Sequence, residues 1–267
     1  MILGPARLRT FRSLMQKQGR TRNGAFLVEG PQAVGEALRS KAEAVDTVLM
    51  TELARGTHSD LLRLVRQTGT EFLEASDSDI SRLSQAKSPQ GVVAISRFID
   101  VKLEALPTDQ NAQFIILNNV RDPGNLGNII RTADAAGVAG VLLTRGSVDV
   151  YNPKVVRAST GSIFNVPLVI GVAFEECIAS LKRLGIRVVA ADISGRSISG
   201  PEQRTLFDNS MVWLFGNEAH GLSNDDLAVA DEVVSVPIFG RAESLSLQTA
   251  AAICIYQSSF ARQGMKS

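Results

Sequence analysis

The amino-acid sequence predicts an α/β protein with two domains, the second of which is built on a parallel sheet. The chain has 267 residues, close to twice the roughly 150 residues of an average domain. Along both halves, short apolar runs typical of strands alternate with segments of helical periodicity. A polar stretch that contains a proline, residues 100–113, separates the halves. We therefore expect a smaller N-terminal α/β domain at residues 1–106 and a second domain at residues 107–267.

The elements of the first half follow one another as strand and helix. Residues 25–29 (AFLVE) are strand-like, and the next two residues, Gly30 and Pro31, form a turn. Proline there suits the first position of a helix. The expected strands are residues 25–29, 45–50 and 91–98, and the expected helices are residues 33–39, 60–67 and 76–84.

The second half repeats this alternation more strongly. Residues 114–117 (FIIL) are continuously apolar, as expected of a strand that is covered on both faces. Runs of the same character are residues 138–144, 187–191 and 212–215, and helical patterns are residues 126–136, 153–160, 174–184 and 243–261. This alternation predicts parallel strands joined by crossover helices.

Composition and charge exclude several classes of protein. With 28 Lys and Arg against 27 Asp and Glu, the net charge is +1, so the chain is not a uniformly basic nucleic-acid coat protein. No apolar run approaches the ~20 residues that span a bilayer, and the N-terminus lacks the apolar segment of a signal peptide. We expect a cytoplasmic protein with no membrane partner. The two cysteines and two histidines have no metal-ligand spacing, so we expect no bound metal.

The first 22 residues are basic, and the first acidic residue of the chain is Glu29. Such an arm attracts polyanions and can lie on RNA phosphates; a solvated helix with a frayed end is the alternative. The candidate RNA contacts are Arg7, Arg9, Arg12, Arg20 and Arg22.

Three polar segments, residues 118–133, 212–223 and 234–248, hold the candidate site. Each places polar residues directly after an apolar strand, where ligands bind in open α/β sheets. In the first segment, Asn125 suits the N-cap of a helix. Arg131 then lies near the helix N-terminus, where the dipole disfavours a cation, which suggests an anionic partner. An ordinary surface arginine is the alternative.

The other two segments offer fewer charged groups. In the second, Gly216 permits close approach of a ligand to the backbone, and Glu218 can pair with Arg131 or accept a hydrogen bond from a ligand. We expect His220 to be a loop histidine with a local hydrogen bond rather than a general base. In the third, Ser244 is a plausible cap of the last helix.

Together, the three segments resemble the motifs of the SpoU/TrmH family of RNA ribose 2′-O-methyltransferases, within the SPOUT class. Residues 119–137 resemble the pattern N-x-x-D-P-x-N-x-G-x-I-x-R-x-A-x-x-x-G, and LFGNEAHGLS and VPIFGRAESLSL resemble the second and third motifs. The segment GAFLVEGPQAVGEAL resembles the L30e-like substrate-binding domain that precedes many of these enzymes. In the third motif, Ser246 stands where the family has asparagine.

The resemblance implies a C-terminal SPOUT domain with a trefoil knot, which binds S-adenosyl-L-methionine mainly through backbone groups and forms a homodimer. The implied reaction is methyl transfer to a ribose 2′-hydroxyl of ribosomal RNA, with 23S rRNA as the first choice. The implied catalytic residues are Arg131, Asn125, Glu218 and Ser244. The implied cofactor-binding residues are Thr144, Gly216, Val236 and Leu245.

Two alternative functions stay open at this point. One is a tRNA ribose 2′-O-methyltransferase of the same family. The other is a non-catalytic RNA-binding protein with a degenerate pocket, which Ser246 favours because serine lacks the two donors of an amide.

Overall fold

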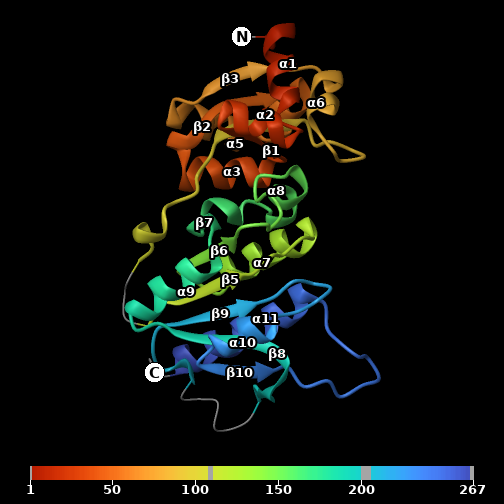
Figure 1. Ribbon diagram of the computed structural model, residues 1–267. Coiled ribbons are helices and arrows are strands. Elements are labelled where there is room, and N and C mark those ends of the chain that lie inside the picture. The colour runs from red at the N-terminus through yellow and green to blue at the C-terminus, as the bar shows by residue number, and fades with distance from the viewer. Residues whose placement is uncertain (1, 108–110, 200–205, 265–267) are drawn as a thin grey trace. The chain divides into compact units, whose positions relative to one another are not determined.

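The computed structural model describes residues 2–107, 111–199 and 206–264 (Figure 1). The chain folds into two compact units: Met1–Ile99 with Asp149–Asn165, and Asp100–Val148 with Val166–Ser267. The first change of unit lies a few residues before the boundary that the sequence suggests. No sequence pattern predicted that residues 149–165 would join the first unit.

The first unit contains a four-stranded mixed sheet of order β1-β4-β2-β3. Its strands are β1 (Ala25–Glu29), β2 (Val45–Met50), β3 (Glu71–Glu74) and β4 (Val92–Arg97). β4 pairs antiparallel with β1 and β2, and β2 pairs parallel with β3. The sequence predicted the first, second and fourth strands. It missed β3, because four residues with a glutamate at each end carry no clear apolar pattern.

Some helices of the first unit begin at residues that favour a helix N-terminus, such as a proline or a capping serine. The helices of this unit are α1 (Pro5–Ser13), α2 (Lys17–Asn23), α3 (Pro31–Ser40), α4 (Glu52–Thr57), α5 (Ser59–Thr68), α6 (Asp77–Leu83) and α8 (Pro153–Ser159), with short 3-10 turns at Ala42–Ala44 and Ser162–Phe164. Pro31 is the first residue of α3, as expected. Ser76 and Asp79 form a reciprocal capping box at the start of α6.

Aromatic packing holds residues 149–165 in the first unit. The ring of Tyr151 lies 4.6 Å from that of Phe26 and 4.3 Å from that of Phe98. The ring of Phe164 stacks on Phe26 at 5.9 Å. The Tyr151 hydroxyl accepts a hydrogen bond from the backbone N–H of Ile99 at 2.8 Å. The segment therefore supplies part of the core of this unit.

The second unit contains a six-stranded sheet of order β10-β8-β9-β5-β6-β7. Its strands are β5 (Gln113–Leu117), β6 (Gly140–Thr144), β7 (Leu168–Val172), β8 (Arg187–Ser197), β9 (Met211–Phe215) and β10 (Glu232–Ser235). Every neighbouring pair is parallel, which confirms the prediction. In each of the strands β5, β6 and β9, all five residues are buried, as their apolar runs indicated.

The helices of the second unit are α7 (Pro123–Ala135), α9 (Phe174–Arg183), α10 (Asn224–Ala228) and α11 (Leu247–Gly264), and a 3-10 turn spans Leu103–Ala105. Helix α11 begins four residues later than residue 243, where the pattern placed it. The Ser246 carbonyl accepts the first hydrogen bonds, from the backbone N–H groups of Thr249 and Ala250 at 3.0 Å each. Ser246 therefore precedes the helix directly, and the expectation that Ser244 caps it is wrong.

A buried polar cluster attaches α11 to the sheet. The Ser258 hydroxyl accepts hydrogen bonds from Gln113 Nε2 at 2.7 Å and from Trp213 Nε1 at 3.0 Å. The Ser259 hydroxyl lies 3.3 Å from Gln113 Oε1. Because these polar groups satisfy one another away from water, they specify how the helix sits on β5 and β9.

Two further properties concern the apolar character of the helices and the chemistry of the two thiols. Among the helices of the described residues, none is both long enough and apolar enough to cross a lipid bilayer. Cys177 and Cys254 are buried, and burial raises the pKa of each thiol to about 12. Both are protonated at neutral pH and serve as core residues.

Candidate functional site

The candidate site lies at the carboxyl ends of three adjacent parallel strands, β6, β5 and β9. Residues 118–122 follow β5, and residues 216–223 follow β9. Since the strands are parallel, these loops lie at the same edge of the sheet, where α/β sheets bind ligands.

Thr144, the last residue of β6, holds the loop after β5. Its hydroxyl accepts a hydrogen bond from the backbone N–H of Asn119 at 3.0 Å and contacts Asn118 Oδ1 at 2.9 Å. Asn118 Nδ2 in turn donates to Asp226 at 3.1 Å. The Thr144 side chain is buried and occupied by these contacts. A role of Thr144 toward a cofactor would therefore pass through the loop that it positions.

Asn119 and Asn217 join the loop after β5 to the loop after β9; both lie in the predicted motif segments, but no role was predicted for either. Asn119 has a φ of 58°, a left-handed conformation that asparagine tolerates better than most residues. Its carbonyl accepts a hydrogen bond from Asn217 Nδ2 at 2.8 Å. Asn217 Oδ1 accepts from the backbone N–H groups of Ala219 at 2.9 Å and His220 at 3.3 Å. The amide of Asn217 therefore shapes its own turn and ties it to the neighbouring loop.

Gly216 is required by this turn. A Cβ atom at Gly216 would lie 2.3 Å from the carbonyl oxygen of Gly221, closer than non-bonded atoms can approach. Asn217 and Gly221 exchange two backbone hydrogen bonds, at 3.1 and 2.9 Å. The close backbone approach that we expected for a ligand at Gly216 is thus made by the chain itself.

Glu218 is the charged residue that joins the first two polar segments. Its carboxylate accepts hydrogen bonds from the backbone N–H groups of Arg121 at 3.0 Å and Asp122 at 2.9 Å, and from Asn125 Nδ2 at 3.2 Å. The carboxylate therefore binds the start of α7 instead of Arg131. Partial desolvation acts to raise the pKa of Glu218, but these hydrogen bonds outweigh it, and the pKa lies below its ordinary value. Glu218 is ionised at neutral pH, as suits an anion beside a helix N-terminus.

The start of α7 differs from the prediction. Asp122, not Asn125, is the N-cap: its Oδ1 accepts from the backbone N–H of Asn125 at 2.7 Å, and Pro123 takes the first helical position. Because α7 spans Pro123–Ala135, Arg131 lies outside its first and last turns, to which the effect of the helix dipole is confined. The anionic partner of Arg131 that we expected from the dipole is therefore unsupported, and the role of Arg131 rests on the family motif.

The structure brings some of the proposed site residues into contact and leaves others apart. Asn125 and Glu218 are hydrogen-bonded. Arg131 is exposed, and none of the residues that the structure describes bonds to its guanidinium. The third segment forms the loop between β10 and α11. It contains Val236 directly after β10, exposed Ser244 and half-buried Leu245.

Of the five arginines proposed to contact RNA, Arg7 forms an ion pair on the surface. Its guanidinium contacts the Glu71 carboxylate at 2.5 and 2.6 Å and donates to Thr47 at 3.1 Å. The hydrogen bond from Arg7 is the main cause that lowers the pKa of Glu71 to about 2. The positive charge of Arg7 is thus balanced within the chain.

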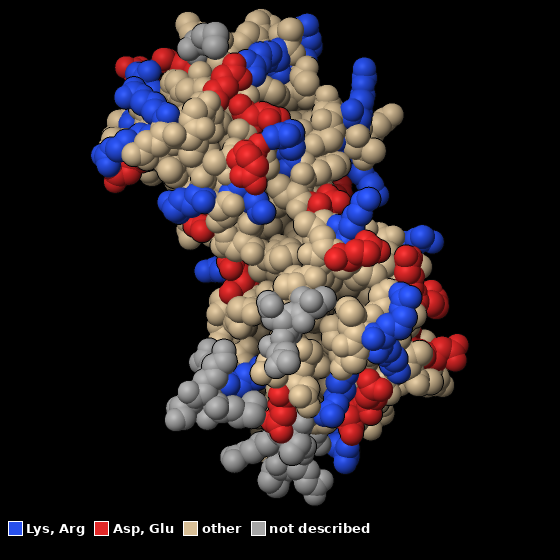
Figure 2. All heavy atoms as spheres, turned by 90° about the vertical axis from the view of Figure 1, so that its left-hand side faces the viewer, with Lys and Arg blue, Asp and Glu red and all other residues tan. Residues whose placement is uncertain are grey.

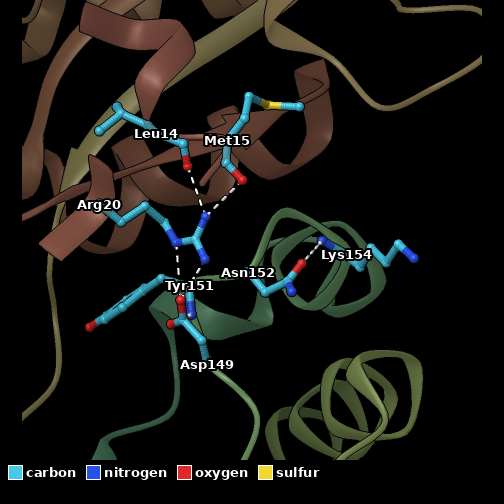
Figure 3. Close-up of polar contacts among 7 residues, drawn as sticks. All are labelled: Leu14, Met15, Arg20, Asp149, Tyr151, Asn152 and Lys154. Atoms are coloured by element: carbon cyan, nitrogen blue, oxygen red, sulfur yellow. Dashed lines mark hydrogen bonds and ion pairs between the residues drawn. The ribbon is translucent and has the colours of Figure 1, made fainter. Parts of the chain in front are cut away.

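Arg20 is buried, with 3% of its surface exposed, and it links α2 to residues 149–165 (Figure 3). Its Nε and Nη2 contact Asp149 Oδ2 at 3.1 and 2.5 Å, and its Nη1 donates to the carbonyls of Leu14 and Met15. The structure therefore gives Arg20 a structural role in place of the phosphate contact that we expected. Exposed residues among the five include Arg9, Arg12 and Arg22.

The surface charges of the face shown in Figure 2 are mixed. Lys and Arg side chains lie among Asp and Glu side chains, with no broad area of one sign. This face therefore offers a polyanion only small, local groups of positive charge.

Replacement of Glu218 by glutamine tests the hydrogen bonds that join the loop after β9 to the start of α7. Glutamine keeps the shape but loses the charge, so at neutral pH we expect the free energy of unfolding of the second unit to fall by about 1 kcal/mol, after allowance for solvent screening. The measurement is urea unfolding followed by fluorescence of Trp213, the single tryptophan of the chain.

The Glu218 contribution also has a defined pH dependence. Because the folded-state pKa lies below the ordinary 4.5, the contribution is complete above that value and is lost as the pH falls through the folded-state pKa. The difference between wild type and Glu218→Gln should therefore shrink in acid. Glu175→Gln, an exposed change on α9, serves as the control. If Glu218→Gln is as stable as wild type at pH 7, the Glu218 carboxylate does not stabilise the second unit, and the prediction is wrong.

An all-parallel sheet with linked polar loops at its carboxyl edge defines a ligand-binding α/β domain. Comparison with known proteins then identifies the family. The model of the SpoU rRNA Methylase family matches residues 112–256, and that of the MRM3-like substrate binding domain matches residues 6–94. The chain belongs to the SpoU rRNA methylase family, as its three motifs predicted.

The similarity to individual proteins covers nearly the whole chain. RlmP of Bacillus subtilis, a 23S rRNA (guanosine(2553)-2′-O)-methyltransferase, is 32% identical, over 94% of each protein. A 23S rRNA (uridine(2479)-2′-O)-methyltransferase of Streptomyces viridochromogenes is also 32% identical, over 94% of this chain and 88% of that protein. The crystal structure of AviRb from Streptomyces viridochromogenes in complex with AdoMet matches with a TM-score of 0.84 and 29% identity. It covers 97% of this chain and 99% of that one.

Proposed function

We propose that this protein transfers a methyl group from S-adenosyl-L-methionine to a ribose 2′-hydroxyl of 23S rRNA. The observation that carries the proposal is the position of the Glu218 carboxylate. It accepts hydrogen bonds from the backbone N–H groups of Arg121 and Asp122 and from the side-chain amide of Asn125, and so joins the first two motifs into one site. The chain also aligns over 94% of its length with relatives named as 23S rRNA 2′-O-methyltransferases, which supports rRNA over tRNA.

The loop between β10 and α11 fits a cofactor that is bound mainly through backbone groups. Within the described part of the chain, no backbone N–H of residues 236–245 donates a hydrogen bond. These groups are available to a ligand, and Val236 and Leu245 would hold the cofactor there together with Gly216. Bound S-adenosylmethionine supplies an electrophilic methyl group on a sulfonium centre.

The residues of the chain would act mainly by positioning. Arginine is a poor base because its pKa exceeds ~12. The exposed guanidinium of Arg131 would instead bind the phosphate beside the target ribose and polarise the 2′-hydroxyl. Asn125 and Glu218 hold the start of the helix that carries Arg131, and Ser244 would contact substrate or cofactor. Correct alignment of the reacting groups is worth several kcal/mol.

Ser246, where the family has asparagine, is compatible with catalysis. It lies directly before α11, its hydroxyl contacts that of Thr249 at 2.8 Å, and its carbonyl accepts the first helical hydrogen bonds. Serine and asparagine rank together at the N-cap of helices. The substitution therefore preserves the end of the cofactor loop, which argues against a degenerate pocket.

The proposal includes assembly and location. Along α11, Ile253 and Phe260 are 40% and 64% exposed, and the rings of Tyr256 and Phe260 lie 5.5 Å apart. This apolar face would form the contact between two copies of the C-terminal domain. The protein would act in the cytoplasm, on rRNA or on an assembling ribosomal subunit.

The test is methyl transfer from labelled S-adenosylmethionine to separate pools of 23S rRNA, 16S rRNA and tRNA, with Arg131→Ala as the control. We expect label in 23S rRNA that depends on Arg131. Label in tRNA alone would establish the alternative substrate. The two relatives, at equal identity to this chain, are named for the ribose 2′-hydroxyls of different nucleosides, a guanosine and a uridine. The modified nucleotide therefore has to be mapped in the labelled RNA.

A further inference from the structure

A polar hollow between α1 and α2 lies apart from the three motifs. It has a volume of about 560 Å³ and is lined by two glutamines and by Arg9, Thr10, Ser13, Gly19, Arg22 and Asn23. We propose that this hollow binds the sugar-phosphate backbone of single-stranded RNA, with the two arginines on phosphates and the uncharged side chains on ribose hydroxyls. The proposal rests on the proposed function, for which it names a substrate-binding site.

The charge of the hollow favours a polyanion. Arg9 and Arg22 are exposed and form no hydrogen bond or ion pair with any described residue. None of the lining residues is acidic, and the sequence contains no acidic residue before Glu29. Arg7 and Arg20, by contrast, are neutralised by Glu71 and Asp149. Of the five arginines of the arm, two are thus paired within the chain and three are available to phosphate, and of these three Arg9 and Arg22 line the hollow.

The uncharged lining favours RNA among polyanions. The hydroxyls of Thr10 and Ser13 donate to backbone carbonyls of α1, and Asn23 Nδ2 donates to the Gly19 carbonyl at 2.7 Å. These contacts leave the two hydroxyl oxygens and Asn23 Oδ1 as acceptors. A ribose 2′-hydroxyl is a donor that matches such acceptors, and deoxyribose lacks it. No apolar side chain lines the hollow, so nothing in it suits a lipid surface.

The two helices that form the hollow are held rigidly. A Cβ atom at Gly19 would lie 2.0 Å from the Ser13 carbonyl oxygen, so only glycine lets α2 pack this closely on the end of α1. From the buried side, Arg20 donates to the carbonyls of Leu14 at 2.9 Å and Met15 at 3.1 Å, in the turn between the helices (Figure 3). The hollow therefore exists before RNA binds, which reduces the entropy cost of binding.

The test compares two double variants that remove equal charge from the first unit. Arg9→Gln/Arg22→Gln changes the hollow, and Arg66→Gln/Arg82→Gln changes exposed residues of α5 and α6. Binding is measured by fluorescence anisotropy with a labelled 20-nucleotide single-stranded RNA and with DNA of the same sequence, at several salt concentrations. Circular dichroism checks that all variants fold.

We expect the hollow variant to bind the RNA at least about tenfold more weakly, with a salt slope reduced by about 0.7 for each lost phosphate contact. The control variant should stay within about twofold of wild type, and wild type should bind RNA more tightly than DNA. Equal RNA affinity and salt slope in the two double variants would overturn the proposal, as would equal affinity of wild type for RNA and DNA.

Methyl transfer to 23S rRNA, measured on the same proteins, separates this inference from the proposed function. Selective loss of RNA binding in the hollow variant supports the hollow, even if the wild-type protein methylates no RNA. A wild-type enzyme that methylates 23S rRNA, with a hollow variant that binds and methylates equally well, would overturn the hollow and leave the proposed function standing.

Discussion

Arg131→Lys is expected to lower the single-turnover rate of methyl transfer by about 100-fold or more, with S-adenosylmethionine affinity within about twofold of wild type. Lysine keeps the charge, but an ammonium group cannot reproduce the planar fork of a guanidinium that grips a phosphate from two nitrogens. The side chain is exposed and forms no bond with a described residue, so its loss should leave the fold intact. The effect should therefore fall on the rate and not on stability.

Single-turnover measurement is needed because it separates methyl transfer from product release. Arg183→Lys, an exposed change on α9 of the same unit, is the matched control and should react at the wild-type rate. A rate for Arg131→Lys within about threefold of wild type would show that positive charge alone suffices, and the proposed phosphate grip would be wrong.

Arg20→Met is expected to have the largest effect on stability, a loss of about 3–5 kcal/mol in the free energy of unfolding of the first unit. Methionine fills much of the same space, but it leaves the Asp149 carboxylate, 18% exposed, without its cation. It also leaves the carbonyls of Leu14 and Met15 without their donor. A buried charge without a partner costs more than the intact pair contributes.

Urea unfolding followed by circular dichroism measures this loss, and Trp213 fluorescence reports the second unit separately. Arg20→Met/Asp149→Asn should recover part of the stability, because it removes the unpaired charge. The asparagine also keeps an acceptor for the backbone N–H of Tyr151, which donates to Asp149 Oδ1 in the wild-type protein. Arg20→Lys should fall between wild type and Arg20→Met. An Arg20→Met protein as stable as wild type would refute the structural role of Arg20.

Much of the second unit could be predicted from the sequence. Strands that are covered on both faces have to be apolar at every position, so FIIL and the run before Gly216 identified β5 and β9 directly. The start of α7 was harder, because Asp122 and Asn125 are both good N-caps. Pro123 decides between them: proline lacks an N–H, which the first turn of a helix does not need. A helix that starts at Pro123 places Arg131 beyond its first turn.

The alternation of strands and helices and the three family motifs follow from the sequence alone, because residues close together along the chain carry both. Which arginines of the basic arm are available to a ligand depends instead on how the chain folds. The partner that buries Arg20 lies 129 positions away, and the N–H groups that bind the Glu218 carboxylate lie 97 and 96 positions away. A local pattern carries no information about such partners, since hydrogen bonding and burial depend on distance in space.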